Sequence, residues 1–554
     1  MATADALTAG PATRRARGLP GADGVGAVTI ALWIACGFFV LLPIAALAVL
    51  AGDGRQLGVL LQGDVVEAAV NSAVSAVSSA LLAVALGTAF ALLLDRTDVP
   101  GRRGLRLLAL SPLLMPPFVG AIAWLGIAGP TSPVNLAWRE AFGAPLWSIY
   151  GADGVILLLT IHSYPIVMLV VSAALKRIPS DLEQAARVSG AGPVRAVLGV
   201  TLPLLRPALL SSFVLVAVGN LADFGIPSII GLPERYVTLA TLVYRYLQSG
   251  TVDEPLAIVA TIGIVVLVVA LVGLLIDALV GRRGWELDAS AAAPQPIPLH
   301  GARWPVGAAM WLVVLILTIL PLVALLMQAI LRAPGVPVTW ENLTLDHLRT
   351  ALTSETALTG AANSVMLAAL AAVVCGALGL GIGVVVTRAR SRATQGLAAV
   401  ATLPQAVPGI VIAVAWLILA PRLGLFNTPW LILAAYVTSF TALVVQAVTA
   451  PLSATPSSAE EAARIAGAGR LRALVDISCR MALPAAAAGA VLVAVTAVRE
   501  LTLSVLLLSP GSQTLGVAIF SFQQAGAFST AAAWSLVVAV FGLAFVGLVT
   551  RRRS

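Results

Sequence analysis

The chain has 554 residues, of which 59% are hydrophobic and only 10% are charged. A soluble globular protein carries about 25% charged residues, so this composition excludes an ordinary soluble domain and indicates a membrane protein. The formal net charge is +8 at pH 7, but most of the 33 Lys and Arg residues lie in the short segments that we predict to be cytoplasmic. This distribution follows the positive-inside rule and argues against nucleic acid as a partner.

Twelve apolar segments are long enough to cross a bilayer as helices, which takes roughly 20 residues. Strands of a membrane barrel would instead alternate in character over about ten residues. We therefore predict an all-α polytopic protein of the cell (inner) membrane, with lipid around it and both termini cytoplasmic. In chain order the predicted spans are 26–50, 66–94, 105–128, 155–175, 208–230, 256–280, 306–331, 361–386, 397–420, 431–448, 485–508 and 531–549.

The two halves of the chain are similar in sequence. The stretch "VNSAVSAVSSALLAVALGTAFALLLDRT" from residue 70 resembles "ANSVMLAALAAVVCGALGLGIGVVVTRA" from residue 362, which pairs Asn71 with Asn363 and Arg96 with Arg388. Parallel repeats of this kind commonly enclose a pathway between them. The predicted organisation is a cytoplasmic tail (1–24), a first six-helix repeat (25–281), a cytoplasmic linker (282–304) and a second, parallel six-helix repeat (305–554).

A polar decapeptide occurs in both halves, after the fourth predicted span. It reads "EQAARVSGAG" from Glu183 and "EEAARIAGAG" from Glu460. Each copy predicts a short helix with a Glu and an Arg four residues apart, an ion pair worth only about 0.2–0.5 kcal/mol. Gly190 and Gly467 are expected to end these helices, because glycine tolerates a positive φ. Loops usually diverge faster than the elements they connect, so this similarity indicates a function rather than a repeated surface loop.

The decapeptides resemble the EAA loop of binding-protein-dependent ABC importer permeases. That motif has Glu-Ala-Ala, a Gly four residues after the second Ala, and then a Leu-Pro pair. The resemblance assigns ATPase coupling to Glu183, Ala185, Ala186 and Gly190 in the first loop (180–207), and to Glu460, Glu461, Ala462, Ala463 and Gly467 in the second loop (457–484). Leu202 and Pro203 complete the first motif, whereas Cys479 and Arg480 replace the Leu-Pro pair in the second.

Other stretches, such as "LADFG" and "RELTLSVLLLSPGSQTL", are similar to the fused iron(III)-type permeases, and the resemblance covers nearly the whole chain. It implies inward transport of iron(III) or another small polar or metal solute, with thiamine, phosphonate and polyamine as alternatives. It also implies an extracytoplasmic solute-binding protein and two copies of a separate ATPase, which would bind ATP and Mg. This chain is expected to be no enzyme and to hold no cofactor, since its single lysine, Lys176, lies in no phosphate-binding loop.

The main alternative is a twelve-helix secondary transporter of the major facilitator type. The stretch "DRTDVPGRRG" resembles the D-R-x-G-R-R signature of that class, but residues 97–100 stand between Arg96 and Gly101, where the signature has one residue. A positive-inside anchor explains the stretch better. A secondary transporter also gives no reason for two EAA loops.

Charged residues inside the predicted spans mark candidate positions on a pathway, because a charge is costly there. Asp223 and the pair Arg499 and Glu500 are expected roughly two-thirds of the way through the fifth span of each half. Alternatively, Arg499 and Glu500 only satisfy each other or a neighbouring span. Pro116 and Pro408 are expected to break the third spans and expose backbone carbonyls, or to serve packing alone. The long outer segments 129–154 and 332–360 would receive the binding protein or anchor the membrane interface.

Overall fold

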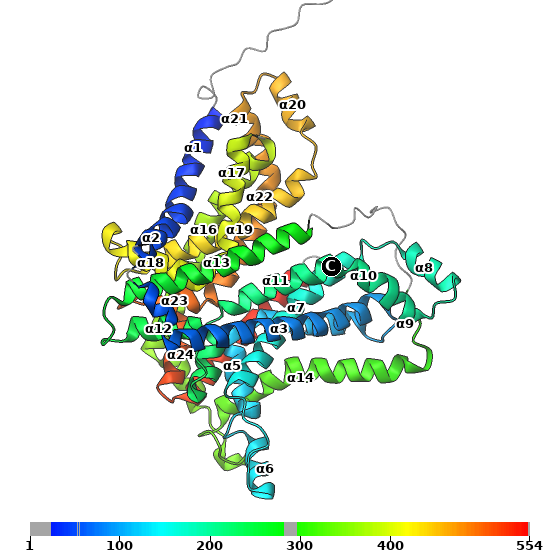
Figure 1. Ribbon diagram of the computed structural model, residues 1–554, viewed down its shortest axis with the longest axis vertical. Helices are drawn as coiled ribbons and strands as arrows, with labels where there is room; N and C mark the ends of the chain where they lie inside the picture. Colours follow the sequence, from blue (N-terminus) through cyan, green and yellow to red (C-terminus); the bar gives the residue numbers. More distant parts are fainter. Residues whose placement is uncertain (1–23, 53, 55, 282–295, 390, 552–554) are drawn as a thin grey trace, which may run out of the picture.

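The computed structural model describes residues 24–52, 54, 56–281, 296–389 and 391–551. Within these residues the chain is a set of packed helices, and no β-strand is formed beyond two isolated bridges. The predicted tail (1–24), apart from its last residue, and most of the predicted linker (282–304) lie outside the described residues. Figure 1 shows the helices and their labels; η denotes a short 3₁₀ or π segment.

The first half contains α1 (Gly24–Cys36), η1 (Gly37–Leu41), α2 (Leu42–Ala51), η2 (Leu57–Leu61), α3 (Gly63–Arg96), α4 (Arg102–Ala109), η3 (Ser111–Leu114), α5 (Pro117–Ala128), α6 (Pro133–Phe142), α7 (Ala152–Leu175), α8 (Ser180–Val188), α9 (Pro193–Ala196), η4 (Val197–Thr201), α10 (Leu202–Leu204), α11 (Arg206–Leu221), η5 (Pro227–Gly231), η6 (Leu232–Glu234), α12 (Leu239–Gln248) and α13 (Pro255–Gly281).

The second half contains η7 (His300–Ala302), α14 (Arg303–Ile330), η8 (Trp340–Asn342), α15 (Asp346–Thr353), α16 (Glu355–Arg388), α17 (Arg392–Thr402), η9 (Leu403–Gln405), α18 (Gly409–Leu423), α19 (Pro429–Ser453), α20 (Ser458–Ile465), α21 (Arg470–Ala473), η10 (Leu474–Cys479), α22 (Arg480–Val498), α23 (Thr502–Leu506), α24 (Leu515–Gln524) and α25 (Phe528–Arg551).

Among the described residues, eight helices are long and apolar enough to cross a membrane, and three bent pairs raise this number to eleven. The twelfth predicted span corresponds to α25, of which Phe528–Gly542 is a shorter apolar stretch. The all-α class is confirmed, whereas the count of twelve stays a prediction. Two predicted spans are wrong in detail: 208–230 and 485–508 are not continuous helices, because α11 ends at Leu221 and α22 ends at Val498.

The longest helices, α3 and α16, organise the two halves in the same way. Each has 34 residues and is therefore about 50 Å long. Helix α3 packs against α7 and α11, and α16 packs against α19 and α22. Glycines allow this close approach: a Cβ at Gly87 would lie 2.6 Å from the Tyr164 carbonyl oxygen, and one at Gly379 would lie 2.4 Å from Val444 Cβ. Small residues permit the same tight packing at helix interfaces in membranes generally.

The first helical region of each half packs against the other half. Helices α1 and α2 contact α16, α17 and α18, while α14 contacts α4 and α5. These two contacts between the halves use equivalent residues. A Cβ added at Gly396 would lie 3.2 Å from the Trp33 ring of α1, and a Cβ added at Gly104 would lie 3.2 Å from the Trp311 ring of α14. The indole Nε1 of Trp33 also donates to the Ala393 carbonyl (3.2 Å). Each half therefore depends on the other for part of its packing.

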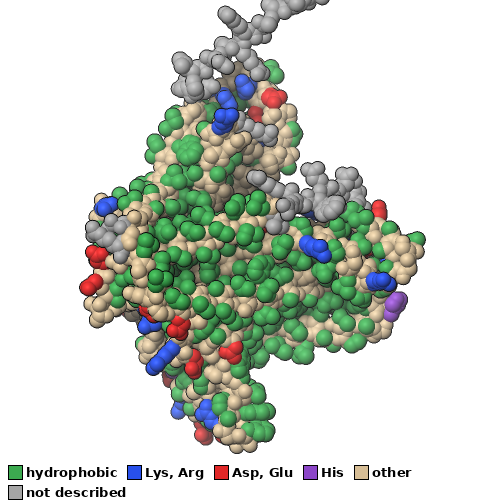
Figure 2. Space-filling model, viewed as in Figure 1, with side chains coloured by type: hydrophobic (Ala, Val, Ile, Leu, Met, Phe, Trp, Pro, Cys, Tyr) green, Lys and Arg blue, Asp and Glu red, His purple; other side chains and the backbone are tan. Residues whose placement is uncertain are grey.

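The outer surface is apolar over much of its extent. Hydrophobic side chains cover the middle of the face shown in Figure 2, and charged side chains lie mostly at its periphery. Leu81 and Leu82 of α3, and Val268, Val269 and Val272 of α13, are exposed apolar residues. A soluble monomer rarely exposes an apolar surface this extensive, so this belt fits contact with lipid.

Candidate functional site

Two polar loops and two breaks inside the membrane region contain the residues that the sequence marked. In each loop, the glycine at the end of the first short helix has the predicted left-handed backbone: φ is +91° at Gly190 and +93° at Gly467. The Ala191 amide donates to the Ala186 carbonyl, and the Ala468 amide donates to the Ala463 carbonyl, both at 3.0 Å. These bonds are the Schellman arrangement of a helix C-terminus. The conserved spacing in the two copies therefore produces the same helix–turn–helix.

The loop glutamates Glu183 and Glu460 are buried, with 7% and 8% of their surface exposed. Glu183 lies 3.5 Å from Arg96 Nη2 and accepts a hydrogen bond from Thr201. The Arg96 Nη2 group also donates to the Leu175 carbonyl at 3.2 Å. We call each such pair of a loop glutamate and the arginine that ends α3 or α16 an inner pin.

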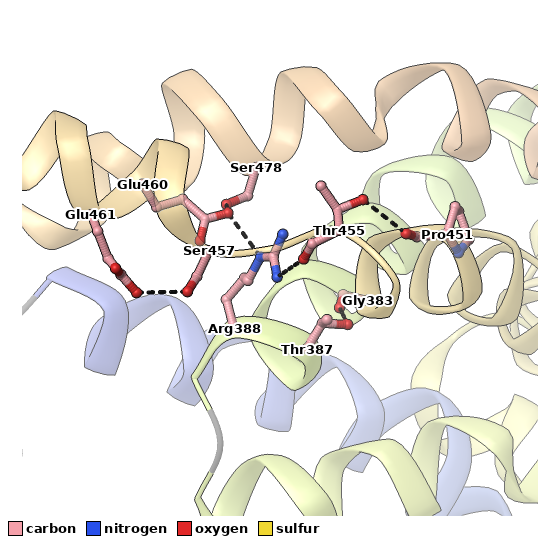
Figure 3. Close-up of polar contacts among 9 residues, drawn as sticks. All are labelled: Gly383, Thr387, Arg388, Pro451, Thr455, Ser457, Glu460, Glu461 and Ser478. Carbon is pink, nitrogen blue, oxygen red and sulfur yellow. Dashed lines mark hydrogen bonds and ion pairs between the residues drawn. The ribbon is translucent and has the colours of Figure 1, made fainter.

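The second inner pin repeats the first (Figure 3). Arg388 Nε lies 2.8 Å from Glu460 Oε1, Ser478 donates to the same oxygen at 2.6 Å, and Arg388 Nη1 donates to the Thr455 carbonyl at 3.0 Å. The predicted ion pairs with Arg187 and Arg464 are wrong, because both glutamates turn inward to the ends of the long helices instead. Removing one partner of such a buried pair would leave the other charge unpaired, at a cost of about 3–5 kcal/mol.

The remaining loop residues differ in exposure. Ala185 and Ala462 are exposed, and Ala186 and Ala463 are half-buried. Glu461 is exposed and accepts a hydrogen bond from Ser457 at 2.6 Å, as Figure 3 also shows. Val188 and Ile465 occupy equivalent positions and are 89% and 88% exposed. Each short loop helix thus exposes one alanine and, at its end, Val188 or Ile465, while its glutamate, or the first of two, faces inward.

The two membrane acids lie just after a helix end and not within a helix. Asp223 follows α11, and its Oδ1 accepts the Ile226 amide at 2.9 Å. Glu500 follows α22, and its carboxylate accepts the amides of Leu503 at 2.9 Å and Ser504 at 3.2 Å. Each carboxylate therefore caps the helical turn that continues the chain, where exposed amides and the helix dipole favour a negative charge.

Arg499 makes a contact between the halves. Its Nη1 donates to the Leu113 carbonyl at 2.6 Å, and Leu113 belongs to the break between α4 and α5. No ion pair joins Arg499 to Glu500, both of which the structure describes. Of the two arrangements in the alternative reading, Arg499 is satisfied by a neighbouring span and not by Glu500. A carbonyl freed by a broken helix supplies the partner, as the prolines of the third span led us to expect.

The predicted breaks at Pro116 and Pro408 are confirmed. The helical segments on either side of them meet at 105° in the first half and 104° in the second. Both prolines are extended, with φ and ψ of −56° and 140° at Pro116 and −53° and 137° at Pro408. Because proline cannot donate a backbone hydrogen bond, the chain turns sharply at the same place in both halves.

An aromatic cluster that the sequence did not indicate joins the halves. Phe224 follows α11, Tyr244 belongs to α12, and Phe520 belongs to α24. Their ring centroids are 5.1 to 6.0 Å apart, within the range of favourable aromatic pairs. Phe118 of α5 lies against the same region, close to Gly225 and Gly516. We call Phe224, Tyr244 and Phe520 the aromatic closure, because they hold α12 of one half against α24 of the other.

The two polar loops lie away from this closure. In Figure 1, α8 and α20 are at two separate extremities of the molecule, whereas α12 and α24 lie close together. The long helices α3 and α16 run from the region of α12 and α24 toward these two extremities. The halves therefore meet near the aromatic closure and diverge toward the loops.

A two-half helical membrane protein with paired polar loops and broken helices is the architecture of a transport permease. The chain belongs to the family described as "Binding-protein-dependent transport system inner membrane component", whose model matches residues 83–285 and again 377–553. This double match confirms the fused repeat of an ABC importer permease. Members of this family work with an ATPase and a substrate-binding protein, and the chain is accordingly a multi-pass membrane permease component that supports small-solute import.

Two kinds of relative are similar to this chain. The "Fe(3+)-transport system permease protein FbpB 2" of Haemophilus influenzae is 23% identical over 495 residues, covering 88% of this chain and 90% of that protein. The "Molybdenum transport system permease protein ModB" of Mycobacterium bovis is 32% identical over 234 residues, covering 42% of this chain and 87% of that protein. A probable molybdenum permease of Haloferax volcanii is also 32% identical, over 254 residues.

Sequence reasoning missed the arginines of the inner pins, although the signal was present. The alignment of the halves already paired Arg96 with Arg388, and each stands at the end of a long apolar segment. A repeated buried arginine needs a repeated acid, and the loop glutamates are repeated too. The aromatic closure gave a weaker signal: Tyr244 and Phe520 occupy equivalent positions of the repeats, but Phe224 meets Leu501.

Proposed function

We propose that this chain is the translocation subunit of an ATP-driven importer that moves a small solute inward, and that iron(III) is its solute. The relative that covers nearly the whole chain is an iron(III) permease, whereas the molybdenum relatives each cover less than half of it. Molybdate is the second candidate, because the identity to those relatives is higher. The solute is cargo, and a separate extracytoplasmic protein delivers it.

The observation that carries the proposal is the equivalence of the two loops. Each has the same pinned glutamate, the same left-handed glycine and the same exposed apolar residue, Val188 or Ile465. Two equivalent surfaces on one chain suit two copies of one partner. We assign each loop to one subunit of a cytoplasmic ATPase that binds ATP and Mg, with both termini of this chain on the same side.

Reconstitution tests the proposal. The chain is purified with the ATPase and the binding protein encoded beside it, and uptake of radioactive iron(III) and of molybdate into proteoliposomes is compared. We expect ATP-dependent uptake of one solute and none without the binding protein. Uptake that continues without any ATPase and follows a proton gradient would instead support a secondary transporter.

A further inference from the structure

We infer that α3 and α16 act as rigid rods, each connecting one coupling loop to the aromatic closure through polar contacts at both of its ends. The inference deepens the proposed function and rests on it for the meaning of the loops, but the contacts themselves belong to this chain alone. The same set of contacts occurs independently in both halves.

The inner end of each rod is fixed by the inner pin. Arg96 is the last residue of α3 and is 2% exposed, while Arg388 is the last residue of α16. In the second half the acceptor Glu460 also binds Ser478, just before α22. The pin therefore joins three elements, so the loop cannot shift without moving the rod or breaking a buried ion pair.

A second set of contacts, which we call the outer clamp, holds each rod at its ninth and tenth residues, toward its outer end. In the first half, Asn71 Nδ2 donates to the Val237 carbonyl at 3.0 Å, and the Leu239 amide donates to Ser72 Oγ at 2.7 Å. The equivalent residues of the second half repeat this arrangement. Both serines are buried, with 2% of their surface exposed.

The second outer clamp uses the residues aligned with the first. Asn363 Nδ2 donates to the carbonyls of Gly511 and Gln513, both at 2.9 Å. The Leu515 amide donates to Ser364 Oγ at 2.8 Å. The Asn-Ser pair therefore has the same role in both long helices. It binds the segment that begins α12 or α24.

The clamped segments lead directly to the aromatic closure. Leu239 begins α12, which carries Tyr244, and Leu515 begins α24, which carries Phe520. These rings contact each other and Phe224. A displacement at the outer end of either rod is thus transmitted to one member of the closure within a few residues.

The rods are suited to transmit a displacement. Neither α3 nor α16 contains a proline, whereas α7, α14, α19 and α22 each have one inside the helix. Proline is the commonest cause of a sharp kink. An uninterrupted helix of 34 residues, packed on two neighbours, moves as one body, so a loop displaced by an ATPase would pull on the closure of its own half.

Hydrogen exchange on the full chain in lipid nanodiscs tests the rods without any partner. The amides of Leu239 and Leu515 report on the two outer clamps. We expect Glu460→Gln to speed exchange at Leu515 by about threefold or more and to leave Leu239 unchanged, since local openings differ across a structure. Glu183→Gln should do the reverse. Glu461→Gln is the matched control, because this neighbouring acid is exposed and takes no part in a pin.

Faster exchange in only one half distinguishes transmission along a rod from a merely structural role of the glutamate. A general loss of stability would speed exchange at both reporters, and a local role would confine the change to the loop; either result would overturn the inference. If Glu460→Gln does not fold, Arg388→Lys keeps the charge but loses the guanidinium fork, and it should produce a smaller change in the same half.

A second measurement relates the rods to transport. In the complex with the ATPase and the binding protein, Asn363→Leu should reduce stimulation of ATP hydrolysis by the loaded binding protein at least fivefold, with basal hydrolysis retained. Thr359→Val, an exposed change four residues away on the same helix, is the control. Unchanged stimulation in Asn363→Leu contradicts the inference, whereas no stimulation in the parental complex contradicts the proposed function and leaves the exchange result to decide the rods.

Discussion

Replacing Gly467 by serine should uncouple the second loop from its partner by disturbing a single turn. Gly467 has φ of +93°, and nothing lies within 4 Å of the position where a Cβ would be added. The substitution therefore introduces no clash, and its whole effect is the cost of the left-handed backbone. For an L-residue this cost is about 1–2 kcal/mol.

The size of the effect follows from that cost. A change of 1–2 kcal/mol lowers the equilibrium ratio of intact to open turn by a factor of about 5–30, which should appear as faster exchange of the Ala468 amide, the donor to Ala463. The same variant should bind the ATPase more weakly and transport more slowly. Gly190→Ser should have the same effect in the first loop, where φ is +91° and the space is equally open.

Gly469→Ser is the matched control, since it lies in the same loop with open space around it and φ of −63°. It precedes α21, where serine is a preferred cap, so this variant should exchange and transport at least as well as the parent. Equal behaviour of Gly467→Ser and Gly469→Ser would refute the argument that backbone conformation fixes this turn.

Three further outcomes are expected. Glu500→Ala should impair uptake into vesicles more than Asp223→Ala, because Glu500 caps two backbone amides and Asp223 caps one. Losing such a cap costs about 1 kcal/mol. Parental uptake by both variants would make these acids dispensable. Gly104→Leu should overpack against Trp311 and lower the free energy of unfolding by about 1–3 kcal/mol, and adding Trp311→Ala should recover part of this loss in a thermal unfolding assay. The purified chain alone should hydrolyse no ATP, and hydrolysis should appear only when the ATPase is added.

Local sequence patterns predicted much of the architecture. The long apolar segments correspond to helices because every backbone polar group must be satisfied within the membrane. The loop glycines adopt the positive φ that their spacing after a short helix requires. Pro116 and Pro408 stand in the extended breaks directly before α5 and α18, where a helix cannot run through them. Each of these features depends on a residue and its near neighbours along the chain.

Hydropathy overextended the fifth and eleventh spans. Residues 222–230 and 499–508 are apolar enough to continue a helix, yet α11 and α22 stop before Asp223 and Glu500. A hydropathy average does not register that one carboxylate can begin a new helical turn by accepting backbone amides. The sequence therefore identified the two acids as charges among apolar residues, but it placed them inside a helix instead of just after a helix end.

The sequence by itself determined a membrane protein of two similar halves, each with the same polar loop, a broken third span and an acid near the end of the fifth. Tertiary structure alone decided that the loop glutamates face Arg96 and Arg388 rather than the arginines four residues away, and that the first helical region of each half packs on the other. The reason is that short-range pairs gain little in water, whereas a buried charge must find a partner wherever the fold places one. Repetition in sequence marks such residues, but only the packing of helices distant in the chain brings them together.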